Sequence, residues 1–114
     1  MRTLDQINLA ATDRLAALEA ANFVKSSFPV EQVILFGSKA RGDGGSDSDI
    51  DLLILTRGEP PTEMSKVMWR YFWQIQKNRN VMLSTVVVPM DQWQHGVYQA
   101  MLLKSEVERD GVTL

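Results

Sequence analysis

Two apolar runs separated by a polar, glycine-rich loop constrain the fold of this chain more than any other feature. The first run covers Val33–Phe36 and ends abruptly at Gly37, and the second covers Ile50–Leu55. Side chains alternate between two faces along a strand, and the second run is apolar on both faces beyond Asp51. A strand of this kind is an interior strand of a sheet that is covered on each side. The pattern therefore predicts a layered α/β fold.

Two carboxylates lie at the beginning of the second strand. Asp49 and Asp51 are two positions apart, so they share a face, with Cα atoms roughly 6.6 Å apart. Carboxylates held this close repel each other unless protons or a cation intervene. Mg²⁺ takes oxygen ligands at such a spacing and keeps water and substrate phosphates as its other ligands. The pair therefore predicts a magnesium site on the rim of the sheet.

The turn after the first strand has the residues of an anion site. Gly37 lets the backbone turn sharply and approach a ligand closely, and successive backbone N–H groups in such a turn attract phosphate. Ser38 adds a hydroxyl, and Lys39 and Arg41 add positive charge. These two cations have two open interpretations, phosphate contact and solvated loop charge. A phosphate site and a metal site on consecutive elements suit the binding of a nucleoside triphosphate.

This block of residues resembles the signature of minimal nucleotidyltransferase domains, which belong to the DNA polymerase β-like nucleotidyltransferase superfamily. The matching residues are Gly37-Ser38-Lys39-Ala40-Arg41-Gly42 and Ser46-Asp47-Ser48-Asp49-Ile50-Asp51-Leu52. The resemblance implies transfer of a nucleotidyl group of the AMP type from a triphosphate, ATP being expected, to a hydroxyl acceptor. It assigns the triphosphate to Gly37 and Ser38, with less defined roles for Lys39 and Arg41. It makes Asp49 and Asp51 the catalytic ligands of two Mg²⁺ ions.

The resemblance also suggests a partner. Minimal domains of this kind resemble the antitoxin half of a toxin–antitoxin pair, whose other half is a small helical HEPN-type protein. A chain of 114 residues has little room for a separate acceptor-binding domain, so we expect such a protein partner or a homodimer. Nucleic acid is expected only as an acceptor.

The signature is incomplete at one position. Active members of the family carry a third carboxylate on the next strand, which we expect over Val81–Val88. The matching position falls at Ser84 or Thr85, and neither is acidic. Two functions therefore stay open. One is a working nucleotidyltransferase, and the other is a catalytically weakened module that binds nucleotide and metal and regulates a partner.

Hydrophobic periodicity predicts the remaining elements. We expect one domain over residues 1–114, of the α/β class, with helices packed on a small mixed sheet. The expected elements are a helix from Thr3 to Phe28 opened by a capping box at Thr3 and Gln6, a helix over 62–78, a helix from Asp91 to Gly111, and a short edge strand over 112–114.

Composition limits the setting of the protein. The net charge of −2 argues against a general polyanion binder, and the absence of cysteine excludes disulfides and thiolate metal sites. With no apolar run near 18 residues, we expect a cytoplasmic protein and no membrane. His95 is expected on a helix surface. The aromatic residues 69–73 are expected in the core, with partner contact as the alternative that three Trp and six Met favour slightly.

Overall fold

The computed structural model describes residues 1–114, and strand β3 lies inside its sheet, as an apolar strand requires. The sheet has five strands in the order β1-β5-β2-β3-β4. β3 pairs antiparallel with β2 and parallel with β4, so the sheet is mixed as predicted. The strands are β1 (Arg2–Thr3), β2 (Val30–Phe36), β3 (Ile50–Thr56), β4 (Leu83–Pro89) and β5 (Val112–Thr113).

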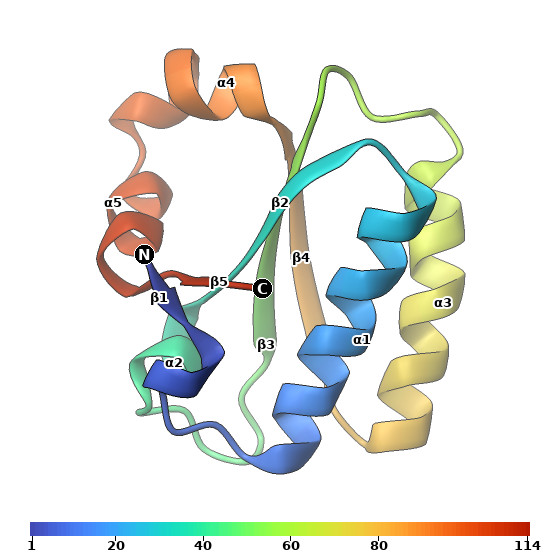
Figure 1. Ribbon diagram of the computed structural model, residues 1–114, viewed down its shortest axis with the longest axis vertical. Coiled ribbons are helices and arrows are strands. Elements are labelled where there is room, and N and C mark those ends of the chain that lie inside the picture. The colour runs from blue at the N-terminus through green and yellow to red at the C-terminus, as the bar shows by residue number, and fades with distance from the viewer.

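Helices cover both faces of the sheet. Figure 1 shows α1 and α3 on one side of β2, β3 and β4, with α4 and α5 on the other. The helices are α1 (Ala11–Ser27), α2 (Gly37–Arg41), α3 (Met64–Arg79), α4 (Met90–His95) and α5 (Leu102–Asp110), with 3-10 turns at Leu4–Gln6 and Val97–Ala100. No helix is both long enough and apolar enough to cross a membrane.

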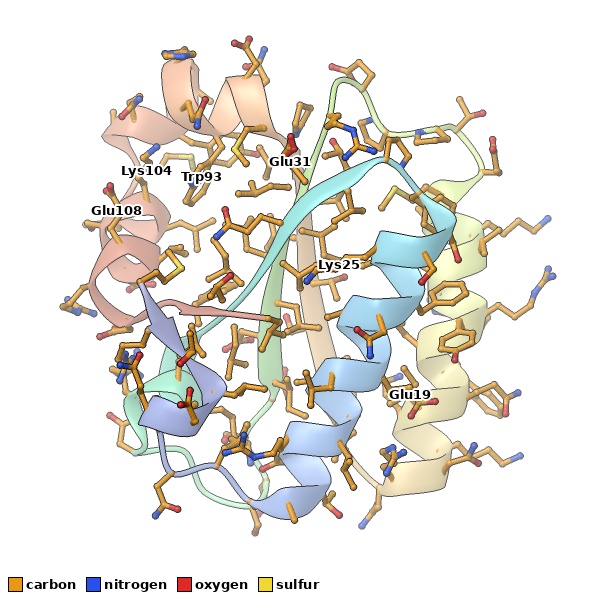
Figure 2. The ribbon with its side chains drawn as sticks, viewed as in Figure 1. Glu19, Lys25, Glu31, Trp93, Lys104 and Glu108 are labelled. Carbon is orange, nitrogen blue, oxygen red and sulfur yellow. The ribbon has the colours of Figure 1, made fainter.

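The alternation of β3 divides the core into two clusters. Ile50, Leu52 and Ile54 pack in a cluster of 17 buried residues beneath α1 and α3. Leu53 and Leu55 point the other way and pack in a cluster of six. In that smaller cluster Trp93 of α4 lies below the ammonium group of Lys104, which is 5.0 Å from the ring centroid (Figure 2). Each fully buried Leu or Ile contributes roughly 1.5–3 kcal/mol relative to an exposed one, so β3 is fixed from both sides.

The first helix begins later than the sequence predicts. The capping box forms, with the Thr3 N–H donating to Gln6 Oε1 at 2.8 Å, but it begins a 3-10 turn, and α1 starts at Ala11. Tertiary pairing explains the difference, because Arg2 and Thr3 form β1 against β5 and draw the N-terminus away from the helix axis.

The C-terminal part also differs from its prediction. The expected helix from Asp91 to Gly111 is broken at Gly96, whose backbone is extended, with φ −96° and ψ −158°. The terminal strand exists but is not an edge strand. Val112 is fully buried and pairs with β1 on one side and β2 on the other.

A buried ion pair ties α2 to α1. Lys39 Nζ donates to Asp13 Oδ2 at 2.7 Å and to the Gly45 carbonyl at 3.1 Å, and the two side chains are 6% and 12% exposed. By contrast, Glu19 on α1, which Figure 2 labels, forms an ion pair with Arg79 on α3 in which each side chain is about a third exposed. Loss of one partner of a buried pair leaves the other charge without compensation, which is strongly destabilising.

We therefore expect Lys39→Met to lower the free energy of unfolding by about 3–5 kcal/mol, measured by urea denaturation, because Asp13 loses its only cation. Arg79→Met is the matched control. It removes an exposed pair and should cost only about 0–1 kcal/mol. Equal losses in the two variants would contradict a structural role for the Asp13–Lys39 pair.

Candidate active site

Gly37 lies closer to Asp51 than any residue with a side chain at position 37 could. Gly37 is the first residue of α2 and has φ +77°, a conformation that favours glycine. A Cβ at this position would lie 2.1 Å from Asp51 Oδ2. The backbone at the beginning of α2 therefore packs directly against one of the two predicted metal-binding carboxylates.

The turn predicted to bind phosphate forms the N-terminus of α2, at Gly37 and Ser38. No side chain caps α2, so its first N–H groups have no capping partner. The Ser38 carbonyl accepts N–H groups from Gly42, Asp43 and Gly44 at 3.0–3.2 Å, which folds the following loop back on the helix. This arrangement leaves the N–H groups at the start of α2 free to face an anion next to Asp51.

Asp49 and Asp51 are held together without a compensating cation of their own. Asp49 is exposed and Asp51 is half-buried. Burial, and then the neighbouring Asp49 charge, raise the pKa of the Asp51 carboxyl, while Arg41 opposes the rise. Two repelling carboxylates at the edge of a core favour the binding of a cation.

The register of β4 identifies the third position of the site. Ser84 is the Cα partner of Asp51 in the parallel ladder, whereas Thr85 is the partner of Leu52. Paired residues share a face, so Ser84 lies on the face of Asp51 and Thr85 on the opposite one. The position that sequence analysis left between two residues is thus Ser84, which is exposed and carries no charge.

Lys39 and Arg41, the two cations predicted near the phosphate, belong to different ion pairs. Arg41 lies near Asp51, but its guanidinium is 3.2 Å from Asp43 and 3.7 Å from Asp110. Lys39 is buried in its pair with Asp13, so it is not a solvated loop charge. That pair forms part of the wall of a cavity of about 1080 Å³, whose lining includes neither Asp49 nor Asp51.

Asp13 and Asp110 are two buried acids that were not predicted from the sequence. A signal existed for Asp13, because it falls on the apolar face of α1 in register with Ala16, Ala17, Ala20 and Ala21, which are all buried. An acid on such a face requires a buried cation. Asp110 is bonded by its sequence neighbour Arg109, but the other two cations near it, Arg41 and Arg2, come from distant parts of the chain and gave no local signal.

The donor set fits Mg²⁺ only in part. No three residues among His, Cys, Asp and Glu come together as a metal cluster. Asp51, beside the beginning of α2, and its neighbour Asp49 nevertheless match the chemistry of Mg²⁺, which commonly binds through one or two carboxylates and completes its shell with water and phosphate oxygens. Asp49 and Asp51 could therefore hold the ion that accompanies a triphosphate.

Comparison with known proteins identifies the family. The model of the nucleotidyltransferase domain family matches residues 18–108, so the chain belongs to that family. No curated protein matches the chain. Among solved structures, a mutant of the toxin–antitoxin MntA–HpeT is similar with a TM-score of 0.55 and 17% identity, over 85% of this chain and 69% of that one. A toxin–antitoxin with AMP-PNP is similar with a TM-score of 0.57 and 14% identity, over 91% and 72%. These two likenesses show the fold, and the family supports nucleotidyltransferase activity.

The contact between Gly37 and Asp51 makes a first prediction for the site. Gly37→Ala adds left-handed strain of about 1–2 kcal/mol and a collision with the carboxylate. Gly58→Ala is the matched control, because Gly58 has φ +74° and nothing within 4 Å of a Cβ. We expect both variants to lose stability, and only Gly37→Ala to lose Mg²⁺-dependent nucleotide binding in calorimetry. Unchanged binding by Gly37→Ala would place the phosphate elsewhere.

The raised pKa of Asp51 makes a second prediction. Burial and the Asp49 charge hold the pKa of the folded Asp51 carboxyl above its ordinary value. The unfolded chain therefore releases this proton first as pH rises, and stability falls through that window. Asp51→Asn removes the penalty, so at neutral pH without metal we expect a gain of up to about 1 kcal/mol, a size limited by solvent screening. Asp43→Asn, at an exposed acid, should bring no gain. A loss of stability in Asp51→Asn would contradict the repulsion.

Proposed function

We propose that this chain binds a nucleoside triphosphate with Mg²⁺ and transfers its nucleotidyl group to a hydroxyl of a protein partner. The observation that carries the proposal is the contact of the beginning of α2 with Asp51. Backbone N–H groups next to a carboxylate suit a phosphate that is bound together with a metal ion. Gly37 and Ser38 would hold the phosphates, and Asp49 and Asp51 would hold the metal. An adenine nucleotide is the substrate we favour, since a structure of the same fold contains AMP-PNP.

In the proposed reaction, the acceptor oxygen forms a bond to the α-phosphorus, and the bond from that phosphorus to the oxygen bridging to the β-phosphorus breaks. Pyrophosphate leaves, and the hydroxyl proton passes to a base. Bound Mg²⁺ would neutralise the charge that develops on the phosphate oxygens. The chain itself contributes by holding the triphosphate in line with the acceptor, which is a large part of such catalysis.

The partner we favour is the toxin of a toxin–antitoxin pair, with a small helical protein of the HEPN type as the acceptor. Two structures of the same fold are toxin–antitoxin assemblies. The exposed stripe of Trp69 and Trp73, which are 71% and 45% accessible, supports a protein partner. Tyr71 stacks on Phe23 and Phe72 is buried, so only these two of the four aromatics are left over from the core.

Ser84 supports a second candidate function. A hydroxyl beside Asp51 brings no negative charge and cannot accept the acceptor's proton as a carboxylate does. The chain would then bind the triphosphate and metal, and act on its partner by binding alone. The two functions share a site and differ in whether turnover occurs.

Transfer of label from each radiolabelled nucleoside triphosphate to a small helical protein of the HEPN type, measured with Mg²⁺, separates the two functions. We expect labelled partner with the natural chain and none with Asp49→Asn/Asp51→Asn. Ser84→Asp restores the missing carboxylate on the face of Asp51 and should raise the rate by about 10²-fold. Thr85→Asp adds the same charge on the opposite face and should bring no gain. Metal-dependent binding without transfer would establish the binding module, and neither binding nor transfer would reject both.

A further inference from the structure

The outer edge of the sheet is open at β4. The strand order places β4 last, next to β3 only. The hydrogen bond from the Ile50 N–H to the Met82 carbonyl, at 2.8 Å, sets the phase of the parallel ladder. In that phase Ser84 and Val86 turn their backbone groups toward β3, while Thr85 and Val87 turn theirs outward. The outward N–H and C=O groups of these two residues can therefore pair with a further strand.

The two ends of the β4 edge offer no free backbone N–H group, whereas its middle does. Gln76 Oε1 accepts the Leu83 N–H at 2.8 Å, and Pro89 at the other end has no N–H to offer. The segment available for pairing is therefore limited to Thr85–Val87 and its immediate neighbours. A limited edge of this kind suits one short docked segment better than open-ended aggregation.

An apolar groove runs along the same edge. Its volume is about 580 Å³, and it lies between α3 and the face of β4 that carries Leu83, Thr85 and Val87. Met68 and Phe72 form its floor and are buried, whereas Trp69 on its rim is exposed. Alternate side chains of an added strand would point into this groove, because side chains on one face of a strand recur every second residue.

The helix that borders the groove is strongly basic. α3 carries Lys66, Arg70, Lys77 and Arg79 and has no acidic residue, although the whole chain has a net charge of −2. Arg79 is paired with Glu19, and the Lys77 ammonium lies 5.0 Å from the centroid of the Trp73 ring. Lys66 and Arg70 are exposed and make no ion pair. They share the outer side of the helix, four residues apart.

We propose that β4 and α3 form the docking surface for an extended segment of a partner protein, which adds a strand at Thr85–Val87. Its alternate apolar side chains fill the groove, and its acidic flanks meet Lys66 and Arg70. This inference deepens the proposed function and rests on it for the existence of a protein partner. It assigns the surface and the chemistry of the segment, which are independent of turnover.

The charge of α3 distinguishes this occupant from two others. A second copy of the chain, paired edge to edge through β4, would bring two basic helices close together, and like charges disfavour that arrangement. A single nucleic-acid strand could use the cations and the exposed ring of Trp69, but the other aromatic group of the groove, Phe72, is buried, and the open backbone pairs best with another backbone. An acidic, apolar peptide segment fits the open backbone of β4, the apolar groove and the cations of α3.

The test is fluorescence anisotropy with a short synthetic peptide that alternates valine with threonine and has glutamates at both ends, measured without nucleotide or Mg²⁺. We expect saturable binding that weakens at least about tenfold, or about 1.4 kcal/mol, in Thr85→Pro and in Arg70→Glu. Thr85→Val keeps the N–H and should bind normally, as should Leu15→Ala at an exposed residue of α1. The same peptide with lysine for glutamate should bind at least about tenfold more weakly.

Absence of peptide binding would overturn the proposal, and so would binding that neither Thr85→Pro nor Arg70→Glu affects. If Thr85→Pro fails to fold, Arg70→Glu and the lysine peptide decide alone. Binding of single-stranded oligothymidylate in place of the peptide would assign the surface to nucleic acid, and self-association lost in Thr85→Pro would assign it to a second copy. Repeating the titration with Asp49→Asn/Asp51→Asn, which should bind the peptide normally, separates failure of docking from failure of transfer.

Discussion

The burial of β3 on both faces is the constraint on which the rest of the structure depends. Every residue from Leu52 to Thr56 is buried, so the strand needs a layer of helices on each side and a paired strand at each edge. The burial ends at the beginning of the strand, where Asp49 and Asp51 reach solvent. A carboxylate pair at that point stays partly desolvated, which raises the pKa of Asp51. The site is thus placed by the edge of the core.

The sequence predicted this central part of the fold because its signals are local. Alternation along Ile50–Leu55, the turn at Gly37 and the two-residue spacing of the aspartates each act over a few residues, and the structure confirms the strands and the mixed sheet. The common face predicted for Asp49 and Asp51 rests on strand geometry alone, and Asp49 lies one residue before β3. The closeness of Gly37 to Asp51 does not, because it depends on the antiparallel pairing of β2 with β3.

Long-range contacts explain what the sequence could not predict. Thr3 and Gln6 form their capping box, yet pairing of Arg2 and Thr3 with the last strand overrides the continuous helix. Lys39 follows the motif glycine and serine, but its charge is neutralised by Asp13, 26 residues away. Local motifs identify such side chains without showing which way they point. The choice between Ser84 and Thr85 likewise required the register of β4.

β4 joins the two unusual features of this chain. One face of the strand places Ser84 beside Asp51, where a carboxylate is missing, and the opposite face borders the groove along the open edge. A segment docked at Thr85–Val87 would lie about 4.8 Å from β4, the spacing of neighbouring strands. It would therefore hold a partner protein next to the proposed site, where an acceptor hydroxyl has to be. Docking of this kind removes the translational freedom of the partner before the reaction, so that a two-molecule step becomes effectively a one-molecule step. This gain matters most where abstraction of the acceptor proton is weak.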